Sequence, residues 1–335
     1  MNPLSAVYGQ VAWLRRNWYE RFPGLKRQLG IPVVSVGNLI VGGSGKTPVV
    51  ALVAELLHEA GFRPAVVSRG YQRRQNARDV VIVSDGRSVR AGVDASGDEP
   101  QLLARRLNGV RVVVGTNRYD AGVVARDRLG ADVLILDDGF QHLRLARTVD
   151  LLLLSDADMA ERVLPVGRLR ESLAAARFAD ALLVAEGTRD PGQLARRAGV
   201  DRAFVVRGRY QPLRHVTPYG ETVLHPPRRV VVLAGIARPE RFVNAVRELG
   251  YTVGQQIIFR DHHWYTTSDL QRVRQAAHDT GADAVLTTEK DAVRLEQASP
   301  GGVPFMFLPM DVQVDPADSF RSWLLEQIES ARVPQ

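Results

Sequence analysis

The sequence contains no cysteine, very little lysine and no long apolar run. Without a thiol, the chain can form neither a disulfide bond nor a cysteine-ligated metal site, which fits a reducing compartment. No stretch approaches the ~18 to 20 apolar residues that a bilayer-spanning helix needs. The N-terminus also lacks the apolar core and the cleavage site of a signal peptide. We therefore expect neither disulfide-bonded domains nor membrane-spanning helices.

The rest of the composition is that of an ordinary globular protein. Of 335 residues, 45% are apolar and 24% are charged, which is enough for about two domains with buried cores. The formal net charge of +7 favours anionic partners. Nucleotides, phospholipid surfaces and nucleic acid all belong to that class, and charge alone does not choose among them.

The scarcity of lysine makes Lys46 conspicuous. It is one of three lysines among 44 basic residues, and it lies in the segment 42–47, Gly-Gly-Ser-Gly-Lys-Thr. An ammonium is a compact charge that fits between phosphate oxygens, whereas a guanidinium is a broad planar group. An apolar run at 33–36 precedes the segment, and a helical pattern at 48–60 follows it. This is the strand–loop–helix context of a phosphate-binding loop.

In such a loop, inward-turned backbone N–H groups and a lysine surround a polyphosphate. The residues expected to bind the nucleotide here are Gly42, Gly43, Ser44, Gly45, Lys46 and Thr47. The Thr47 hydroxyl would also coordinate Mg²⁺. The segment departs from the usual loop at Ile40, where a glycine is common. The alternative interpretation is a glycine-rich turn with an incidental lysine.

Two carboxylates follow another apolar run. Asp137 and Asp138 come directly after Val133–Leu136. A P-loop enzyme needs an acidic residue at the end of a neighbouring strand to hold the coordination shell of its Mg²⁺ ion. Two adjacent carboxylates could divide their roles between the metal and the loop. The alternative is a strand that ends in an acidic turn, and it is the combination with Lys46 that favours a metal site.

Further polar segments are candidates for proton transfer. Asp98 precedes a helical pattern, so it is either the N-cap of that helix or a base that accepts a proton from an attacking hydroxyl. Residues 260–265 hold His262 and His263 beside an aspartate, which suggests a proton relay, a polar clamp or a polar loop before the next helix. A zinc site is disfavoured because no third ligand is evident at helical spacing. Residues 288–291 approach a guanine-reading pattern, but their lysine stands one place too late.

The apolar runs divide most of the chain into three parts. Residues 29–202 alternate short β-rich runs with helical ones, which is typical of parallel strands covered on both faces. Residues 203–228 hold two β-rich runs around prolines and a glycine, which predicts a two-stranded connector. Residues 229–335 predict a second α/β unit. The predicted fold is therefore α/β: a P-loop NTPase-like parallel sheet domain and a smaller α/β domain, joined by a β-hairpin linker.

Residues 1–28 differ from these parts. Their apolar residues recur at helical spacing and form a stripe, which consists of Leu4, Val7, Tyr8, Val11, Leu14, Trp18 and Phe22. Basic residues lie among them and just after them. An apolar stripe with aromatic rings and flanking positive charge is what a helix lying on an anionic membrane needs. The alternative is a first helix that packs on the core of the neighbouring domain.

Taken together and in this order, the polar segments resemble those of the tetraacyldisaccharide 4'-kinase family, the lipid A 4'-kinases of Gram-negative bacteria. Each segment is modest, but the ordered set is specific. The irregular loop at Ile40 has the form found in that family. The matching segments are 36–48, Ser68–Tyr71, Gly97–Pro100, Leu136–His142, 164–171, 234–236, Pro239–Phe242, Asp261–His262 and Thr288–Asp291.

The resemblance implies an ATP-dependent kinase that phosphorylates the 4'-hydroxyl of a tetraacylated glucosamine disaccharide 1-phosphate. By motif position, it implies that Asp98 is the catalytic base and that His262 assists it. Lys46 would act on the transferred phosphoryl group, and the metal ligands would be Thr47, Asp137 and Asp138. Substrate-binding or supporting residues would be Ser68, Arg69, Arg170 and Glu171.

The resemblance also implies ATP and Mg²⁺ as cofactors, an acylated disaccharide lipid as substrate and no nucleic-acid partner. It implies a place at the cytoplasmic face of the bacterial inner membrane, where the helix within residues 1–28 would dock on the inner leaflet. Two other functions remain open. One is a P-loop GTPase-like metallochaperone, which the misplaced lysine and the lack of cysteine disfavour. The other is a membrane-peripheral nucleotide-binding adaptor, which would bind ATP without phosphorylating a lipid.

Overall fold

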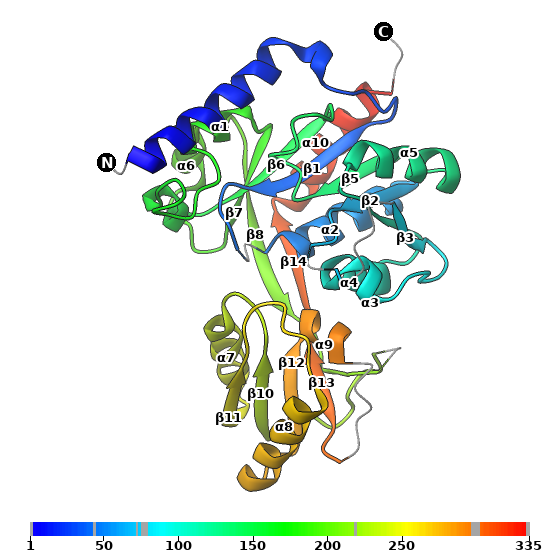
Figure 1. Cartoon of the computed structure of the whole chain (residues 1–335), viewed down its shortest axis with the longest axis vertical. Coiled ribbons are helices and arrows are strands. Elements are labelled where there is room, and N and C mark those ends of the chain that lie inside the picture. Colours follow the sequence, from blue (N-terminus) through cyan, green and yellow to red (C-terminus); the bar gives the residue numbers. More distant parts are fainter. Residues whose placement is uncertain are drawn as a thin grey trace.

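The computed structural model describes residues 3–42, 45–71, 73–74, 80–217, 220–295 and 302–332. They form two α/β bodies, a larger one and a smaller one, each built on its own sheet (Figure 1). The strands of the larger sheet are β1 (Val33–Asn38), β2 (Pro64–Ser68), β3 (Val81–Asp85), β4 (Arg111–Val114), β5 (Val133–Asp137), β6 (Val149–Leu154), β7 (Ala181–Ala185), β8 (Ala203–Tyr210) and β14 (Met310–Asp315). The strands of the smaller sheet are β9 (Arg214–His215), β10 (Arg229–Ala234), β11 (Thr252–Ile258), β12 (Ala284–Thr288) and β13 (Phe305–Leu308).

The larger sheet is parallel except at its two edges. Over the described residues its strand order is β14-β8-β7-β6-β1-β5-β2-β4-β3. β3 and β14 run antiparallel to their neighbours, whereas the strands between them pair in parallel. β3 is therefore an antiparallel edge strand, although the alternation over 29–202 predicted parallel strands. The smaller sheet, in the order β11-β10-β12-β13-β9, is parallel except for the short edge strand β9.

Helices cover both faces of the larger sheet, as a parallel sheet requires. The side chains that join α2, α4 and α10 to one face form a single core cluster, and α5 and α6 cover the other face. The helices of the larger body are α1 (Pro3–Arg21), α2 (Lys46–Glu59), α3 (Val93–Ser96), α4 (Asp98–Arg106), α5 (Arg118–Leu129), α6 (Pro191–Ala198) and α10 (Ala317–Ser330). Short 3₁₀ turns are η1 (Pro23–Leu25), η2 (Asp156–Ala160) and η3 (Leu173–Phe178). The smaller body holds α7 (Pro239–Glu248), α8 (Thr267–Thr280) and α9 (Glu289–Leu295).

The sequence predicted a second unit over residues 229–335, but the end of the chain belongs to the larger body. β14 pairs along its whole length with β8, and α10 buries Phe320 and Trp323 in the core of the larger body. The apolar face of α10 can be recognised in the sequence, but the sheet that it covers cannot. The prediction placed this helix in the smaller body because it follows the second unit along the chain, and that placement was wrong.

The connector predicted over 203–228 is also built differently. Its two strands are β8 and β14, which run together between the bodies (Figure 1). Among the described residues, the β-rich run at 222–224 forms an isolated bridge from Thr222 to Arg214, and the Val223 N–H donates a hydrogen bond to the Leu213 carbonyl oxygen. The two crossings between the bodies are thus distant in sequence, and the chain leaves the larger body along β8 and returns to it along β14.

The apolar stripe of residues 1–28 faces outward. Its side chains are 41 to 67% exposed, whereas Arg16 on the inward side of α1 is fully buried. Figure 1 shows α1 lying along the outside of the larger body. The stripe therefore does not pack on the core, and α1 contacts the larger body through its other side, where Arg16 is buried. Within the described ranges, no helix has both the length and the apolar character that crossing a membrane demands.

Candidate active site

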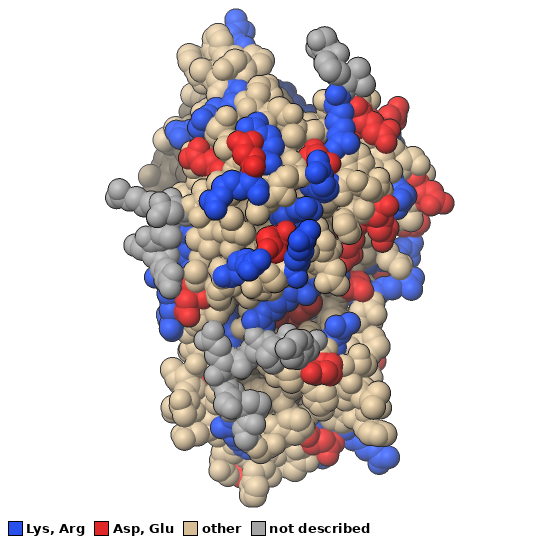
Figure 2. Space-filling view, turned by 90° about the vertical axis from the view of Figure 1, so that its right-hand side faces the viewer, with Lys and Arg blue, Asp and Glu red and all other residues tan. Residues whose placement is uncertain are grey.

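A cavity of about 1160 Å³ lies where the two bodies face each other. The larger body lines it with the loop that follows β1, with the ends of β2 and β5 and with α4. The smaller body contributes residues 236–238, 261–262 and 288–290. Ligands of open parallel sheets bind outside the carboxyl ends of the strands, which is where this cavity lies. Figure 2 shows basic side chains gathered on the larger body above the junction of the two bodies. The cavity therefore suits an anionic ligand.

The predicted phosphate loop lines this cavity. Gly45 has a φ of 76°, a left-handed conformation that suits glycine, and helix α2 begins directly after it. Lys46 Nζ donates a hydrogen bond of 3.2 Å to Asn38 Oδ1. Gly42, Lys46 and Thr47 also line the cavity, whereas Gly43 and Ser44 fall outside the described residues. The positive end of α2 is thus directed at the space beside Lys46.

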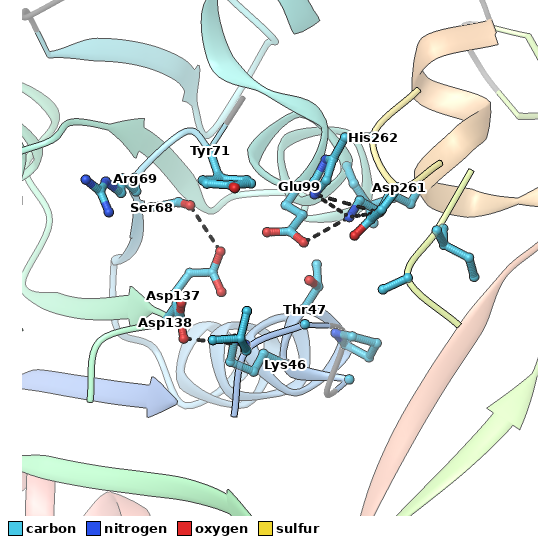
Figure 3. Close-up of a pocket in the computed structure, with 18 of the residues that line it drawn as sticks. Lys46, Thr47, Ser68, Arg69, Tyr71, Glu99, Asp137, Asp138, Asp261 and His262 are labelled. Atoms are coloured by element: carbon cyan, nitrogen blue, oxygen red, sulfur yellow. Dashed lines mark hydrogen bonds and ion pairs between the residues drawn. The ribbon is translucent and has the colours of Figure 1, made fainter. Parts of the chain in front are cut away.

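Asp137 is the last residue of β5 and is almost completely buried. Ser68 Oγ donates a hydrogen bond of 3.1 Å to Asp137 Oδ2 (Figure 3). Burial and the neighbouring charges of Glu99 and Asp138 raise the pKa of Asp137 to about 7. Burial and the two neighbouring carboxylates thus outweigh the opposing charge of Lys46.

Asp138 lies beside the phosphate loop in a strained turn. Its φ of 57° is left-handed, a conformation that costs a residue with a side chain about 1 kcal/mol. Lys46 Nζ lies 3.4 Å from Asp138 Oδ1, and Arg170 Nη1 donates a hydrogen bond of 2.7 Å to Asp138 Oδ2. Burial alone would raise the pKa of Asp138, but the charges of Lys46 and Arg170 outweigh it and hold the pKa low. Asp138 is therefore an anion held between two cations.

Asp98 meets His262 across the junction of the two bodies. Asp98 is the first residue of α4, and the N-cap of this helix is Gly97, so the N-cap interpretation of Asp98 is wrong. His262 Nδ1 lies 2.8 Å from Asp98 Oδ2. His262 also has a left-handed φ of 60°, which indicates that its position is imposed by the surrounding structure.

Lys290 reaches the other side of the same imidazole. Its Nζ lies 3.1 Å from His262 Nε2, 3.3 Å from a Glu99 oxygen and 3.5 Å from an Asp261 oxygen. An ammonium can only donate hydrogen bonds, so Nε2 must accept one. The proton of a neutral His262 therefore lies on Nδ1, which donates it to Asp98.

The charges of this cluster support one another. Burial would raise the pKa of Asp98, but the hydrogen bond from His262 and the charges of Lys290 and Arg294 outweigh it and lower the pKa. Burial would lower the pKa of Lys290, but Asp98, Glu99 and Asp261 raise it. Asp98 is therefore a carboxylate, and Lys290 an ammonium, at neutral pH.

His263 is separate from this cluster. Its Nε2 lies 3.0 Å from Asp269 Oδ2, and its ring stacks on Phe259 with the ring centroids 4.3 Å apart. Asp269 closes the capping box of α8 with Thr266. The two neighbouring histidines thus differ in role: His262 lines the cavity, and His263 contacts Asp269 at the start of α8.

The remaining predicted residues differ in what their side chains contact. Ser68 and Arg170 contact the aspartates directly, as described above. The guanidinium of Arg69 is directed away from Glu99 and His262 in the view of Figure 3, although the residue lines the cavity. Both carboxylate oxygens of Glu171 accept hydrogen bonds from Arg16 of α1.

Some residues that the structure places at the site had no role predicted from the sequence. Glu99, Asp261 and Lys290 each stand next to an assigned residue or inside a matching segment, and the rarity of lysine was the available signal for Lys290. Asn38, which accepts a hydrogen bond from Lys46, also lies inside a matching segment, 36–48, but no role was predicted for it. Its partner lies eight positions away on another element.

The guanine-reading interpretation of 288–291 conflicts with the structure. Asp291 is fully buried. Its carboxylate accepts hydrogen bonds from the Gly235 backbone, the Tyr265 hydroxyl and Thr288 Oγ1 at 2.7 to 3.0 Å. The acceptor that a guanine would need is therefore used within the smaller body.

Comparisons with known proteins agree with this geometry. A family model described as tetraacyldisaccharide-1-P 4'-kinase matches residues 1–329. A tetraacyldisaccharide 4'-kinase of Geobacter metallireducens is 41% identical over 300 residues, which cover 87% of each chain. One of Syntrophus aciditrophicus is 37% identical over 349 residues, which cover 97% of this chain and 91% of the relative.

The fold agrees as well. A crystal structure of LpxK from Aquifex aeolicus in complex with ATP matches with a TM-score of 0.79 at 30% identity, over 97% of this chain and 98% of that one. Sequence and fold thus agree over nearly the whole length. The chain belongs to the tetraacyldisaccharide-1-phosphate 4'-kinase family.

Proposed function

We propose that this protein transfers the γ-phosphoryl group of ATP to the 4'-hydroxyl of a tetraacylated glucosamine disaccharide 1-phosphate. One observation carries the proposal beyond family membership. Lys46 of the phosphate loop and His262 line the same cavity, and His262 contacts the buried carboxylate Asp98, the proposed base, at 2.8 Å. Phosphoryl transfer needs these two elements, with the acceptor hydroxyl held between them.

The proposed reaction is a direct transfer of the phosphoryl group from ATP to the sugar hydroxyl. The sugar oxygen forms a bond to the γ-phosphorus while the bond from that phosphorus to the β–γ bridging oxygen breaks, which leaves ADP. Asp98 accepts the hydroxyl proton, and His262 keeps the accepting oxygen oriented. Lys46 and the loop N–H groups stabilise the negative charge on the transferred group. Closing the two bodies around the substrates would exclude water and limit hydrolysis of ATP.

The residues beside Lys46 fit a magnesium ion. Mg²⁺ takes oxygen ligands, and one or two protein carboxylates with substrate phosphates suffice. Burial and the charges of Glu99 and Asp138 raise the pKa of Asp137, and a divalent cation bound there would favour its ionised form. Thr47, Asp137 and Asp138 would hold the ion, which would neutralise charge on the phosphates when bound. No group of three or more acidic, histidine or cysteine residues suited to a metal occurs in the described part of the chain.

The lipid side of the proposal rests on α1. Its exposed apolar stripe is flanked by basic residues, which suits a helix lying on an anionic membrane surface. Tyr8, Ala12 and Arg15 of the same helix line the cavity. A lipid whose acyl chains remain in the bilayer could therefore extend its sugar headgroup along α1 toward Asp98. We place this docking at the cytoplasmic face of the inner membrane, where ATP is available.

A single assay tests the proposed function. The purified protein is incubated with γ-labelled ATP, Mg²⁺ and the detergent-dispersed tetraacyldisaccharide 1-phosphate, and label in the lipid fraction is measured. We expect label in the lipid with the native protein and a rate lower by ~10²-fold or more with Asp98→Asn. Hydrolysis of ATP or GTP without labelled lipid would instead favour the metallochaperone. Binding of ATP with no turnover would favour the adaptor.

A further inference from the structure

Arg16 is an exception on its own helix. The outward face of α1 is apolar and exposed, yet the inward face buries this arginine completely. Its Nε lies 2.5 Å from Glu171 Oε2, and its Nη2 lies 2.8 Å from Glu171 Oε1. Nη2 also donates a hydrogen bond of 2.9 Å to the Phe140 carbonyl oxygen. The guanidinium lies 4.2 Å from the centroid of the Phe140 ring.

The two segments that Arg16 binds both reach the phosphate site. Phe140 is two residues after Asp138, and Glu171 directly follows Arg170. Arg170 Nη1 donates hydrogen bonds of 2.7 Å to Asp138 Oδ2 and 3.3 Å to Gln141 Oε1. Asp138 in turn lies 3.4 Å from Lys46 Nζ. A continuous series of contacts thus runs from α1 to the lysine of the phosphate loop.

The turn that contains Asp138 depends on its surroundings. Asp138 is left-handed, and a Cβ at Gly139 would lie 2.6 Å from Leu136 Cβ. A Cβ at Gly37 would lie 2.5 Å from Phe140 Cβ, so β1 and this turn are in close contact. Strained backbone persists where neighbouring groups determine its position. The hydrogen bond from Arg16 to the Phe140 carbonyl is one such restraint.

We propose that Arg16 is a positioning residue for phosphoryl transfer: by holding Phe140 and Glu171 together, it keeps Asp138 and Arg170 in register beside Lys46. Helix α1 is then part of the active-site scaffold as well as the membrane-docking element. This inference rests on the proposed function. A planar guanidinium can bind the carboxylate and the carbonyl at once, which a single ammonium does less well.

A purely structural role for Arg16 predicts something different. If Arg16 only attached α1 to the larger body, its loss would loosen the helix that docks on the lipid. The KM for the lipid and the binding to vesicles would then change, and kcat at saturating lipid would not. A positioning role predicts a lower kcat with the KM for the lipid unchanged.

The test uses Arg16→Met, with Arg21→Met as the matched control, because Arg21 is an exposed arginine on the same helix. Both are assayed with detergent-dispersed lipid acceptor, and their thermal unfolding is compared with that of the native protein. We expect Arg16→Met to lower kcat by ~10- to 100-fold, as displacement of a catalytic group by about 1 Å does. A kcat within about twofold of native, or a loss confined to the lipid KM, would overturn the proposal.

A double-variant cycle tests the route through Arg170. If Arg16 acts through Arg170 and Asp138, then Arg16→Met combined with Arg170→Met should have about the kcat of Arg170→Met alone. Independent effects would multiply, and this result would also overturn the proposal. Should Arg16→Met fail to fold, Arg16→Lys replaces it, since it keeps the charge beside Glu171 and loses the bidentate contact. Absence of lipid phosphorylation by the native protein and by Arg21→Met would refute the proposed function itself.

Discussion

Lys290 Nζ lies 3.1 Å from His262 Nε2, on the imidazole nitrogen opposite the one that faces Asp98. This contact occupies the basic nitrogen of His262, because an ammonium can only donate. Asp98, whose pKa is held low, is then the group free to accept a proton from the substrate. His262 orients Asp98, and Lys290 supplies the charge that keeps it ionised.

The first prediction concerns the pH dependence of turnover. Lys290→Met removes a positive charge from the neighbourhood of Asp98, so the pKa of Asp98 should rise. The base is active only above its pKa, and the acid limb of kcat/KM should therefore move to higher pH. The measurement is the pH profile of kcat/KM for the lipid acceptor. Lys26→Met is the control, because Lys26 pairs with Glu20 outside the cavity; an acid limb unchanged in Lys290→Met would contradict the charge role.

The second prediction separates the two adjacent histidines. His262→Ala removes the group that orients Asp98 and should lower kcat by ~10- to 100-fold. His263→Ala removes a contact to Asp269 at the start of α8, so it should lower the unfolding temperature and leave kcat nearly native. Steady-state kinetics and thermal unfolding of both variants are the measurements. If His263→Ala alone reduced kcat, the assignment of His262 would be wrong.

The third prediction addresses the phosphate loop. Lys46→Ala removes the cation that contacts Asn38 and Asp138, and it should abolish turnover while the fold survives. Turnover with γ-labelled ATP and thermal unfolding are measured in parallel. Retained turnover in a folded Lys46→Ala protein would remove this loop from the mechanism.

The fourth prediction concerns docking on membranes. Serine at Val11, Leu14 and Trp18 together removes exposed apolar surface from α1 and leaves Arg16 in place. Sedimentation with anionic phospholipid vesicles should fall, while kcat on detergent-dispersed acceptor stays near native. Leu224→Ser is the matched control, because Leu224 is an 84% exposed apolar side chain on a different segment.

Unchanged sedimentation of the triple variant would place the docking surface elsewhere. Deleting residues 1–22 would be a less specific experiment. The deletion also removes Arg16 and its contacts with Glu171 and Phe140, so lost activity could not be assigned to lost membrane binding.

Local sequence determined the parts of this protein that depend on neighbouring residues. The strand before Lys46, the glycines of its loop and the helix after it are contiguous, and so are β5 and its two aspartates. Backbone conformation and strand–helix alternation are short-range properties, so composition and periodicity were sufficient to predict them. The order of the polar segments then carried the family resemblance.

Tertiary structure alone decided the relationships between distant segments. Sequence periodicity gave α1 an apolar stripe, but only packing shows that the stripe faces outward and that Arg16 is buried against residue 171. The same holds for Asp98 and His262, which are 164 positions apart, and for β14, which pairs with β8 in the larger sheet. Which residues become partners depends on the packing free energy of the whole fold. A local sequence pattern does not contain this information.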